Sequence, residues 1–336
     1  MLQQKDLTAV YQLIHTPKKI VITSHRNPDG DAMGSSLALL HFLKQLQHEV
    51  VFISPNEFPE FLAWMPDTKN VVIFEREYEK ALALLTNSDL IFTLDFNALH
   101  RTGDAMQQAL EKLSVPMVMI DHHQAPEAYP VVTFSDTSYG STCEMIYDFI
   151  NGLGYNHLIT KEVATCIYTG ITTDSGSFRF PKTTAATHRC VADLIEKGTN
   201  TSEIHNLLFD TSSFSRLQLL GKALQNLVVL PQYQTSYISL SQDELNAFNY
   251  QKGDTEGIVN YGLSLKGIDF AAIFIENKEE GIIKISFRSQ GDFDVNEFSR
   301  NHFNGGGHKN AAGGKSFLPL NETIQQFISI LAQEKC

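Results

Sequence analysis

The sequence predicts an α/β protein with an N-terminal domain built on a mostly parallel sheet flanked by helices, a helical connector, and a smaller C-terminal α/β domain. Three observations predict this class. Short apolar runs alternate with amphipathic segments over the first 135 residues, as in strands joined by right-handed crossover helices. The pattern then turns helical, and strand-like runs return near residue 235. At 336 residues, the chain is also longer than a typical single domain.

The elements follow from apolar spacing, taken in order. The first strand is predicted within 19–23, and an amphipathic helix follows it with apolar positions between 37 and 46. Further strands are predicted at 50–53, 71–74, 90–94, 115–120 and 131–134, with helices at 77–85 and 105–113. Helices then follow at 141–150, 161–172, 184–197, 202–208 and 214–227. In the last part, strands are predicted at 235–240, 270–276 and 282–287, with helices at 295–302 and 322–332.

These elements suggest three parts: a catalytic domain over residues 1–185, a helical connector over 186–225, and a substrate-binding domain over 226–336. We expect the active site in the cleft between the two domains, where a domain movement would enclose a short ligand.

Composition limits the function classes. The hydrophobic fraction of 43% and the charged fraction of 19% are those of an ordinary globular protein. The net charge of −12 argues against long duplex DNA as a partner. The chain has neither a signal-like start nor a membrane-length apolar run, so a cytoplasmic protein without a membrane partner is expected. The four cysteines are far apart and are interpreted as reduced and structural: Cys143, Cys166, Cys190 and Cys336.

Polar side chains follow the ends of several predicted elements. The loop after the first strand carries His25, Asp29 and Asp31, and Asp95 ends the strand at 90–94. Asp121-His122-His123 follows the strand at 115–120, and Asp174 follows a helix. Each of these alone is most often a turn or cap residue. Their recurrence at the carboxyl ends of strands instead indicates one shared site.

Such a site has too much negative charge to stand alone. Four carboxylates and two imidazoles in one crevice would repel and lose hydration, whereas two divalent cations would offset the charge and bind the mixed oxygen and nitrogen donors. Two ions a few ångströms apart, bridged by one carboxylate, suit in-line attack on phosphorus. The sequence therefore predicts a dinuclear hydrolase.

The second domain contains a glycine-rich stretch, Gly305-Gly306-Gly307-His308. These glycines would let the backbone approach a ligand as a nest of N–H groups, with a short helix after them; a flexible turn is the equal alternative. Arg288, at the end of a strand, could grip phosphate, although an exposed arginine there is equally ordinary. No nucleotide-fold fingerprint, phosphate-binding P-loop or G-x-S-x-G elbow occurs.

The motifs resemble one known family over essentially the whole chain. His25-Arg26-Asn27-Pro28-Asp29-Gly30-Asp31, Asp95, Asp121-His122-His123, Asp174 and Gly305-Gly306-Gly307-His308 occur in the order and spacing of the DHH phosphoesterase superfamily. With the stretch Thr173-Asp174-Ser175-Gly176-Ser177-Phe178-Arg179-Phe180, the chain looks most like the nanoRNase and pAp phosphatase (NrnA-like) branch, which has a DHH-associated C-terminal domain.

The resemblance implies a role for each matching residue. One Mn²⁺ would be held by His25, Asp29 and Asp95, and the other by Asp31, Asp95, His122 and Asp174, with Asp95 as the bridge. His123 would touch the scissile phosphate as an electrophile or proton donor, and Asp121 would orient neighbouring groups. The loop from Gly305 to His308 and Arg288 would hold the substrate.

The activity implied is hydrolysis of phosphoesters by a hydroxide bridging two Mn²⁺ ions. Substrates would be RNA oligonucleotides of about two to five nucleotides, cut to mononucleotides, and 3′-phosphoadenosine 5′-phosphate (pAp), cut to AMP. Two alternatives stay open: a phosphodiesterase of cyclic or linear dinucleotides such as pApA or pGpG, and a non-catalytic nucleotide-binding regulatory module. The donor types do not exclude Mg²⁺ or Co²⁺ in place of Mn²⁺. The sequence also leaves open the direction of strand degradation and whether the chain forms a homodimer.

Overall fold

The structure, a computed structural model, describes residues 3–334. The chain divides into two compact units between Thr211 and Ser212, inside the stretch where the connector is expected. Cys336 lies outside the described residues, and the other three cysteines are buried free thiols, as predicted. No helix within residues 3–334 combines the length and the apolarity that crossing a bilayer requires.

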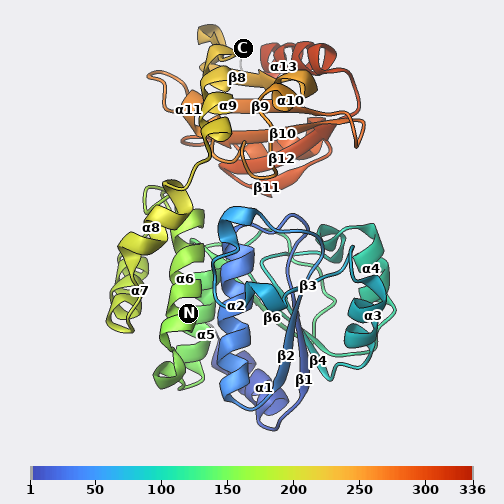
Figure 1. Ribbon diagram of the computed structural model, residues 1–336, viewed down its shortest axis with the longest axis vertical. Helices are drawn as coiled ribbons and strands as arrows, with labels where there is room; N and C mark the ends of the chain where they lie inside the picture. The colour runs from blue at the N-terminus through green and yellow to red at the C-terminus, as the bar shows by residue number, and fades with distance from the viewer. Residues whose placement is uncertain (1–2, 335–336) are drawn as a thin grey trace. The chain divides into compact units, whose positions relative to one another are not determined.

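The first unit is a parallel sheet covered by helices on both faces (Figure 1). Its elements are α1 Gln4–Ile14, β1 Lys19–Thr23, α2 Gly30–Gln45, β2 Glu49–Ser54, β3 Val72–Ile73, α3 Tyr78–Thr86, β4 Leu90–Leu94, α4 Asp104–Glu111, β5 Met117–Asp121, β6 Val132–Ser135, α5 Thr142–Gly152, α6 Lys161–Asp174, α7 Ala185–Glu196 and α8 Thr201–Phe209. Helices α2, α5 and α6 cover one face, and α3 and α4 the other (Figure 1).

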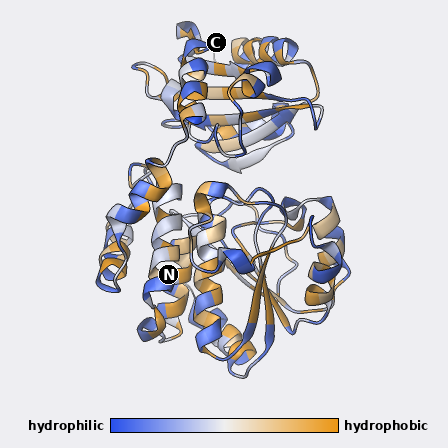
Figure 2. Cartoon of the chain, viewed as in Figure 1, coloured by the Kyte–Doolittle hydropathy of each residue, from blue (hydrophilic) through white to orange (hydrophobic). Residues whose placement is uncertain are grey.

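Burial on both faces explains why the strands have no alternating pattern. Every residue of β4 and β5 is buried, and a strand covered on both sides is apolar along its whole length. Figure 2 shows these central strands in the hydrophobic colours, while the outer helices α3 and α4 mix both kinds of residue. The sheet is therefore a rigid base for the loops that follow its strands.

The strand order of this sheet reverses between β1 and β4. The order is β3-β2-β1-β4-β5-β6 with all neighbours parallel. The chain moves outward from β1 to β2 and β3, then returns to β4 on the other side of β1. Ligand sites in open parallel sheets lie at the carboxyl ends of the strands that flank such a switch, here β1 and β4.

Helix α2 is the central helix of this unit because it is buried on nearly all sides. It packs against α6, and small residues allow the close approach. A Cβ added at Gly34 would lie 2.6 Å from the carbonyl oxygen of Cys166. At Gly30 an added Cβ would meet the Thr173 side chain, so the first turn of α2 lies beside the last turn of α6.

The second unit has a mixed sheet of order β11-β12-β10-β9-β8-β7, antiparallel except for the β8–β9 pair. One core lies under α12 and α13, and the other under α9, α10 and α11. The elements are α9 Phe214–Gln225, β7 Val228–Leu230, β8 Thr235–Leu240, α10 Gln242–Ala247, α11 Val259–Leu263, β9 Phe270–Asn277, β10 Ile282–Ser289, α12 Val295–His302, β11 Gly306–His308, β12 Ala311–Ser316 and α13 Leu320–Glu334.

The glycine-rich stretch differs from its prediction. No short helix follows it; the chain forms the hairpin β11–β12 at the edge of the sheet. The physical reason is that Ala311, Ala312, Gly313 and Gly314 pair with β10 through an unbroken antiparallel register, which satisfies their backbone groups better than a short isolated helix would.

Candidate metal centre

Three neighbouring strands of the first unit deliver polar side chains to one edge of the sheet. His25 lies two residues beyond β1, Asp95 directly follows β4, and Asp121 ends β5 with His122 and His123 after it. Because β1, β4 and β5 are adjacent and parallel, their carboxyl ends meet. The side chains of all five residues are buried or nearly so.

The loop between β1 and α2 is held by its own hydrogen bonds. Asp29 caps α2, and its Oδ1 accepts the N–H groups of Asp31 and Ala32 at 3.0 Å each. Asn27 has a φ of 57°, and Asn56 from the loop after β2 clamps it: Asn56 Oδ1 accepts the Asn27 N–H at 2.7 Å, and Asn56 Nδ2 donates to Asn27 Oδ1 at 2.8 Å. The capping leaves Asp29 Oδ2 pointing toward His25 Nε2, 3.9 Å away.

Two helices add the remaining carboxylates. Asp31 lies in the first turn of α2, and its two carboxylate oxygens accept the backbone N–H groups of Thr142 at 2.6 Å and Cys143 at 2.9 Å. Asp174 is the last residue of α6. Its Oδ2 lies 3.3 Å from His122 Nε2. The packing of α2 against α6 therefore brings together two residues that are far apart in the sequence.

These residues form two groups whose donor atoms lie within 4.8 Å of one another: His25, Asp29 and Asp95 in one, and Asp31, His122 and Asp174 in the other. Asp95 lies between the groups. Its Oδ2 is 3.5 Å from His25 Nε2, and its Oδ1 is 3.5 Å from His122 Nε2. All six residues predicted as metal ligands are thus brought together, with Asp95 in the middle.

The donor chemistry fits divalent cations. His25 Nδ1 donates to the carbonyl oxygen of Arg26 at 2.9 Å, so the neutral ring directs the lone pair of Nε2 at Asp29 and Asp95. His122 Nε2 likewise faces three carboxylates, at 3.3 to 3.7 Å. Lone pairs that converge on ionised carboxylates repel unless a proton or a metal ion lies between them.

The pKa values of the clustered aspartates and histidines are shifted by burial and by the neighbouring charges. Burial, reinforced by the neighbouring Asp29, raises the pKa of Asp31 to about 7. Burial and the Asp31 charge hold the pKa values of Asp95 and Asp174 well above their usual range. Burial also lowers the pKa of His122 to about 3 and that of His25 below its usual value. The protein therefore concentrates carboxylates where water cannot stabilise their charge.

His123 and Asp121 form a separate pair beside these groups. His123 Nδ1 donates to Asp121 Oδ1 at 2.7 Å, which is a hydrogen-bond length and leaves no room for an ion between the two atoms. Asp121 is fully buried, and its Oδ2 has no hydrogen-bond partner among the described residues. This hydrogen bond fixes the orientation of the His123 ring.

In the second unit, the glycines serve the packing of the hairpin. A Cβ at Gly305 would lie 1.9 Å from the carbonyl oxygen of Gly313. The Gly305 N–H donates to the carbonyl of Ser299, and the Gly307 N–H to Asn296 Oδ1. The expected nest of N–H groups is therefore wrong for these two glycines, because their N–H groups are already used within the unit.

Arg288 on β10 and His308 on β11 are aligned across the sheet, on either side of Ala311 on β12. Ala311 of β12 pairs with Arg288 on one side and with His308 on the other. Paired residues point to the same face, and two strand spacings put the backbones of Arg288 and His308 roughly 10 Å apart. Arg288 is half-buried, and its Nη1 donates to the carbonyl of Phe287 at 2.9 Å. The register thus joins two residues that the sequence singled out separately.

Four residues of the site escaped the sequence analysis. Thr142 donates hydrogen bonds to Asp31 and Asp95, and Asn56 donates one to Asn27 in the loop before α2. Two half-buried cations also interact electrostatically with residues of the cluster. Arg101 acts on His123 and Asp121, and Lys182 on His122 and Asp174. None of the four belongs to a motif, and only their position in the fold reveals them.

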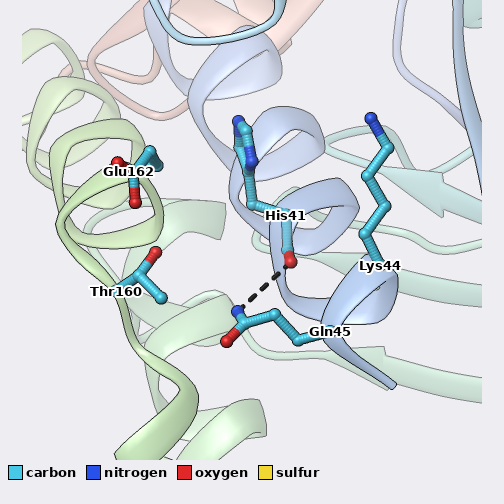
Figure 3. A pocket seen from close by; sticks show the side chains of 5 residues that line it. All are labelled: His41, Lys44, Gln45, Thr160 and Glu162. Carbon is cyan, nitrogen blue, oxygen red and sulfur yellow. Dashed lines mark hydrogen bonds between the residues drawn. The ribbon is translucent and has the colours of Figure 1, made fainter. Parts of the chain in front are cut away.

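One further hollow is unrelated to the cluster. Figure 3 shows it between α2 and the start of α6, lined by His41, Lys44, Gln45, Thr160 and Glu162. Asp31 lies at the other end of α2, roughly 15 Å away along the helix axis from His41. The hollow contains none of the predicted site residues.

Comparison with known proteins agrees with this geometry. The model of the DHH family, N-terminal domain, matches residues 19–171, and that of the DHHA1 domain matches residues 231–334. The chain is 29% identical over 317 residues to the bifunctional oligoribonuclease and PAP phosphatase NrnA of Thermus thermophilus, covering 94% of this chain and 90% of that protein. It is 25% identical over 331 residues to the cyclic-di-AMP phosphodiesterase GdpP of Geobacillus thermodenitrificans, covering 95% of this chain but 48% of that protein.

A solved structure is similar over the whole chain. The crystal structure of an exopolyphosphatase-related protein from Bacteroides fragilis is 40% identical, with a TM-score of 0.94, and the match covers 99% of this chain and 97% of that one. Both domain models occur in the expected order, and the buried aspartate and histidine groups suit metal ions. The chain therefore belongs to the DHH family of metal-dependent phosphoesterases, in its NrnA-like branch.

Proposed function

We propose that this chain hydrolyses RNA oligonucleotides of a few nucleotides to mononucleotides and converts pAp to AMP. The observation that carries the proposal is the array of carboxylates and imidazoles, most of them buried, at the carboxyl ends of β1, β4 and β5. The name of the Thermus thermophilus relative, an oligoribonuclease and PAP phosphatase, supports the choice of substrates.

The proposed parts are a catalytic domain at 1–185, a connector at 186–225 and a substrate-binding domain at 226–336. We also propose a cytoplasmic location, in keeping with the three buried free thiols.

Two ions are proposed to bind in this array. His25, Asp29 and Asp95 would hold one, and Asp31, Asp95, His122 and Asp174 the other; Mn²⁺ is the first choice, and Mg²⁺ and Co²⁺ suit the same donors. When bound, such ions lower the pKa of water and neutralise charge that develops on phosphorus. The close approach of Asp95 to both histidines supports its role as the shared ligand.

The protein's own residues would manage the proton and the phosphate. In both substrates water adds to phosphorus, the bond from phosphorus to the 3′-oxygen breaks, and a proton ends on that oxygen. With Nδ1 bonded to Asp121, the proton to be transferred is the one on His123 Nε2. Burial lowers the pKa of His123 well below its usual value, so the ring would take up this proton only beside the negatively charged phosphate, where the Asp121 carboxylate would help to stabilise the imidazolium form.

The second unit would bind the remainder of the substrate. Arg288 offers a planar guanidinium that suits a phosphate, and His308 lies in the same row of the sheet. Gly305, Gly306 and Gly307 would form the backbone of this part of the nucleotide site, where Gly305 and Gly307 allow the close packing of the hairpin and Gly306 has nothing nearer than 3.5 Å to an added Cβ.

Two other functions have specific support. The match to GdpP favours a phosphodiesterase of cyclic or linear dinucleotides, but this chain spans about half of that relative. The description of the Bacteroides fragilis structure makes inorganic polyphosphate worth testing. A non-catalytic nucleotide-binding module would bind nucleotides without turnover.

One assay separates these functions. Purified protein, freed of metal by chelation and reloaded with Mn²⁺, is incubated with an RNA trimer, pAp, pApA, pGpG, cyclic di-AMP, pyrophosphate and polyphosphate, and products are separated by ion-exchange chromatography. We expect mononucleotides from the trimer and AMP from pAp, with no release after chelation. A higher kcat/KM on a cyclic dinucleotide, pyrophosphate or polyphosphate would refute the choice of substrate, and binding without any product would refute the enzyme.

A further inference from the structure

We infer that Thr142 is a positioning residue that orients Asp31 and Asp95 toward the ion on the His122 side of the cluster. The inference rests on the metal sites of the proposed function, and it extends them to a residue outside every motif of the chain. Thr142 is the first residue of α5 and is fully buried.

Thr142 contacts two carboxylates through two different donors. Its backbone N–H donates to Asp31 Oδ2 at 2.6 Å, and its Oγ1 donates to Asp95 Oδ1 at 2.9 Å. These two oxygens are the ones that face His122 Nε2, at 3.7 Å and 3.5 Å respectively. Thr142 therefore holds both of these carboxylate oxygens in place through hydrogen bonds.

The hydroxyl matters because Asp95 has to face two ways. Oδ1, which accepts the Thr142 hydroxyl, points toward His122, and Oδ2 points toward His25, so losing the hydroxyl removes the donor that holds the oxygen on the His122 side. Asp95 is 2% exposed, which leaves little room for water to replace a lost donor. Hydrogen bonds to metal-binding carboxylates fix their orientation, and removing one typically weakens metal affinity by about 10- to 100-fold.

On the other side of the cluster, two of the three proposed ligands are held independently of this hydroxyl. Asp29 is held by the N–H groups of its own helix, and the His25 ring by the carbonyl of Arg26. Loss of the Thr142 hydroxyl should therefore act on one ion more than on the other. The start of α5 stays intact as well, since Ser141 caps it by accepting the Glu144 N–H at 3.1 Å.

Three variants isolate the hydroxyl. Thr142→Val removes it but keeps the branched shape and the backbone N–H to Asp31, whereas Thr142→Ser keeps the hydroxyl. Thr68→Val is the matched control, because Thr68 is buried and its hydroxyl donates to the carbonyls of Ala63 and Met65 rather than to the cluster. Binding of Mn²⁺ to the metal-free proteins is measured by titration calorimetry, and folding by thermal unfolding in chelator.

We expect the parent, Thr142→Ser and Thr68→Val to bind two Mn²⁺ ions alike, and Thr142→Val to lose at least tenfold in affinity for one ion and clearly less for the other. If Thr142→Val binds both ions like the parent, or weakens both equally, the inference fails while the proposed function stands. If the folded parent binds no Mn²⁺, the metal sites and this inference fail together. If metal binding follows the expectation but no RNA or pAp is cut, only the proposed substrates fail.

Discussion

Replacing Asp95 by asparagine is expected to stabilise the metal-free protein and to abolish its stabilisation by Mn²⁺. The amide retains an oxygen for the Thr142 hydroxyl and offers an N–H where Asp95 Oδ2 faces His25 Nε2 at 3.5 Å. Asparagine also tolerates the φ of 63° at this position. The substitution thus removes a carboxyl group whose ionisation burial opposes, without removing the local hydrogen bonds.

The magnitude follows from the raised pKa of Asp95, which burial causes first and the Asp31 charge second. An unfolded aspartate releases its proton near pH 3.8, whereas the raised pKa of Asp95 holds the proton to higher pH in the folded protein. Because the pKa of Asp95 is higher in the folded state than in the unfolded state, Asp95 lowers the free energy of unfolding. This destabilisation is absent below the unfolded-state pKa and grows as the pH rises. At about 1.36 kcal/mol per pH unit, its ceiling is roughly 6 kcal/mol at pH 8 and roughly 2 kcal/mol at pH 5.5.

Structural relaxation around Asp95 and its hydrogen bond from Thr142 make the real destabilisation smaller than these ceilings. We therefore expect Asp95→Asn to raise the free energy of unfolding by about 2 kcal/mol at pH 8. For a unit of roughly 210 residues, this raises Tm by roughly 4–8 °C. Thermal unfolding followed by circular dichroism in chelator, at both pH values and then with Mn²⁺, measures the effect. Asp104→Asn, at an exposed helix start, is the control. A variant that is less stable than the parent in chelator at pH 8, or still stabilised by Mn²⁺, would refute the reasoning.

Three further substitutions test the remaining assignments. His123→Ala should lower kcat on pAp by about 10²- to 10⁴-fold and leave Mn²⁺ affinity within twofold; a matching loss of Mn²⁺ in calorimetry would instead make it a ligand. Gly305→Ala should lower the stability of the second unit by about 1–3 kcal/mol in thermal unfolding, because its Cβ would lie 1.9 Å from the Gly313 carbonyl. Gly306→Ala, whose nearest contact is 3.5 Å, should be near neutral, and equal effects would contradict this account. Arg288→Ala should raise KM for an RNA trimer about 10-fold or more without changing Mn²⁺ affinity; an unchanged KM would remove Arg288 from the substrate site.

Most of the fold follows from local patterns. Strands at 90–94 and 235–240 and the helix at 295–302 agree with the observed bounds to the residue, because apolar spacing and turn residues are strong there. Short elements were missed, including α1, α10, α11 and β7. The three helices have five to eleven residues, which is too short for intrinsic helical preference to reveal them, and β7 is a largely exposed strand of three residues.

The glycine-rich stretch shows the limit of local interpretation. Glycines permit a nest, a turn or a strand with nearly equal ease, so the sequence alone left the choice open. Pairing with β10, and the contacts of Gly305 with Ser299 and Gly313, decided for a hairpin.

For the site, the sequence by itself determined the types of donor and which strand ends carry them, since aspartate and histidine after buried strands are visible in the order of residues. Only the tertiary structure decided that Asp95 lies between His25 and His122, and that Thr142 contacts Asp31 from 111 positions away. These contacts depend on the strand order and on the packing of α2 against α5 and α6. Such packing arises from many buried side chains together, and no single motif records it.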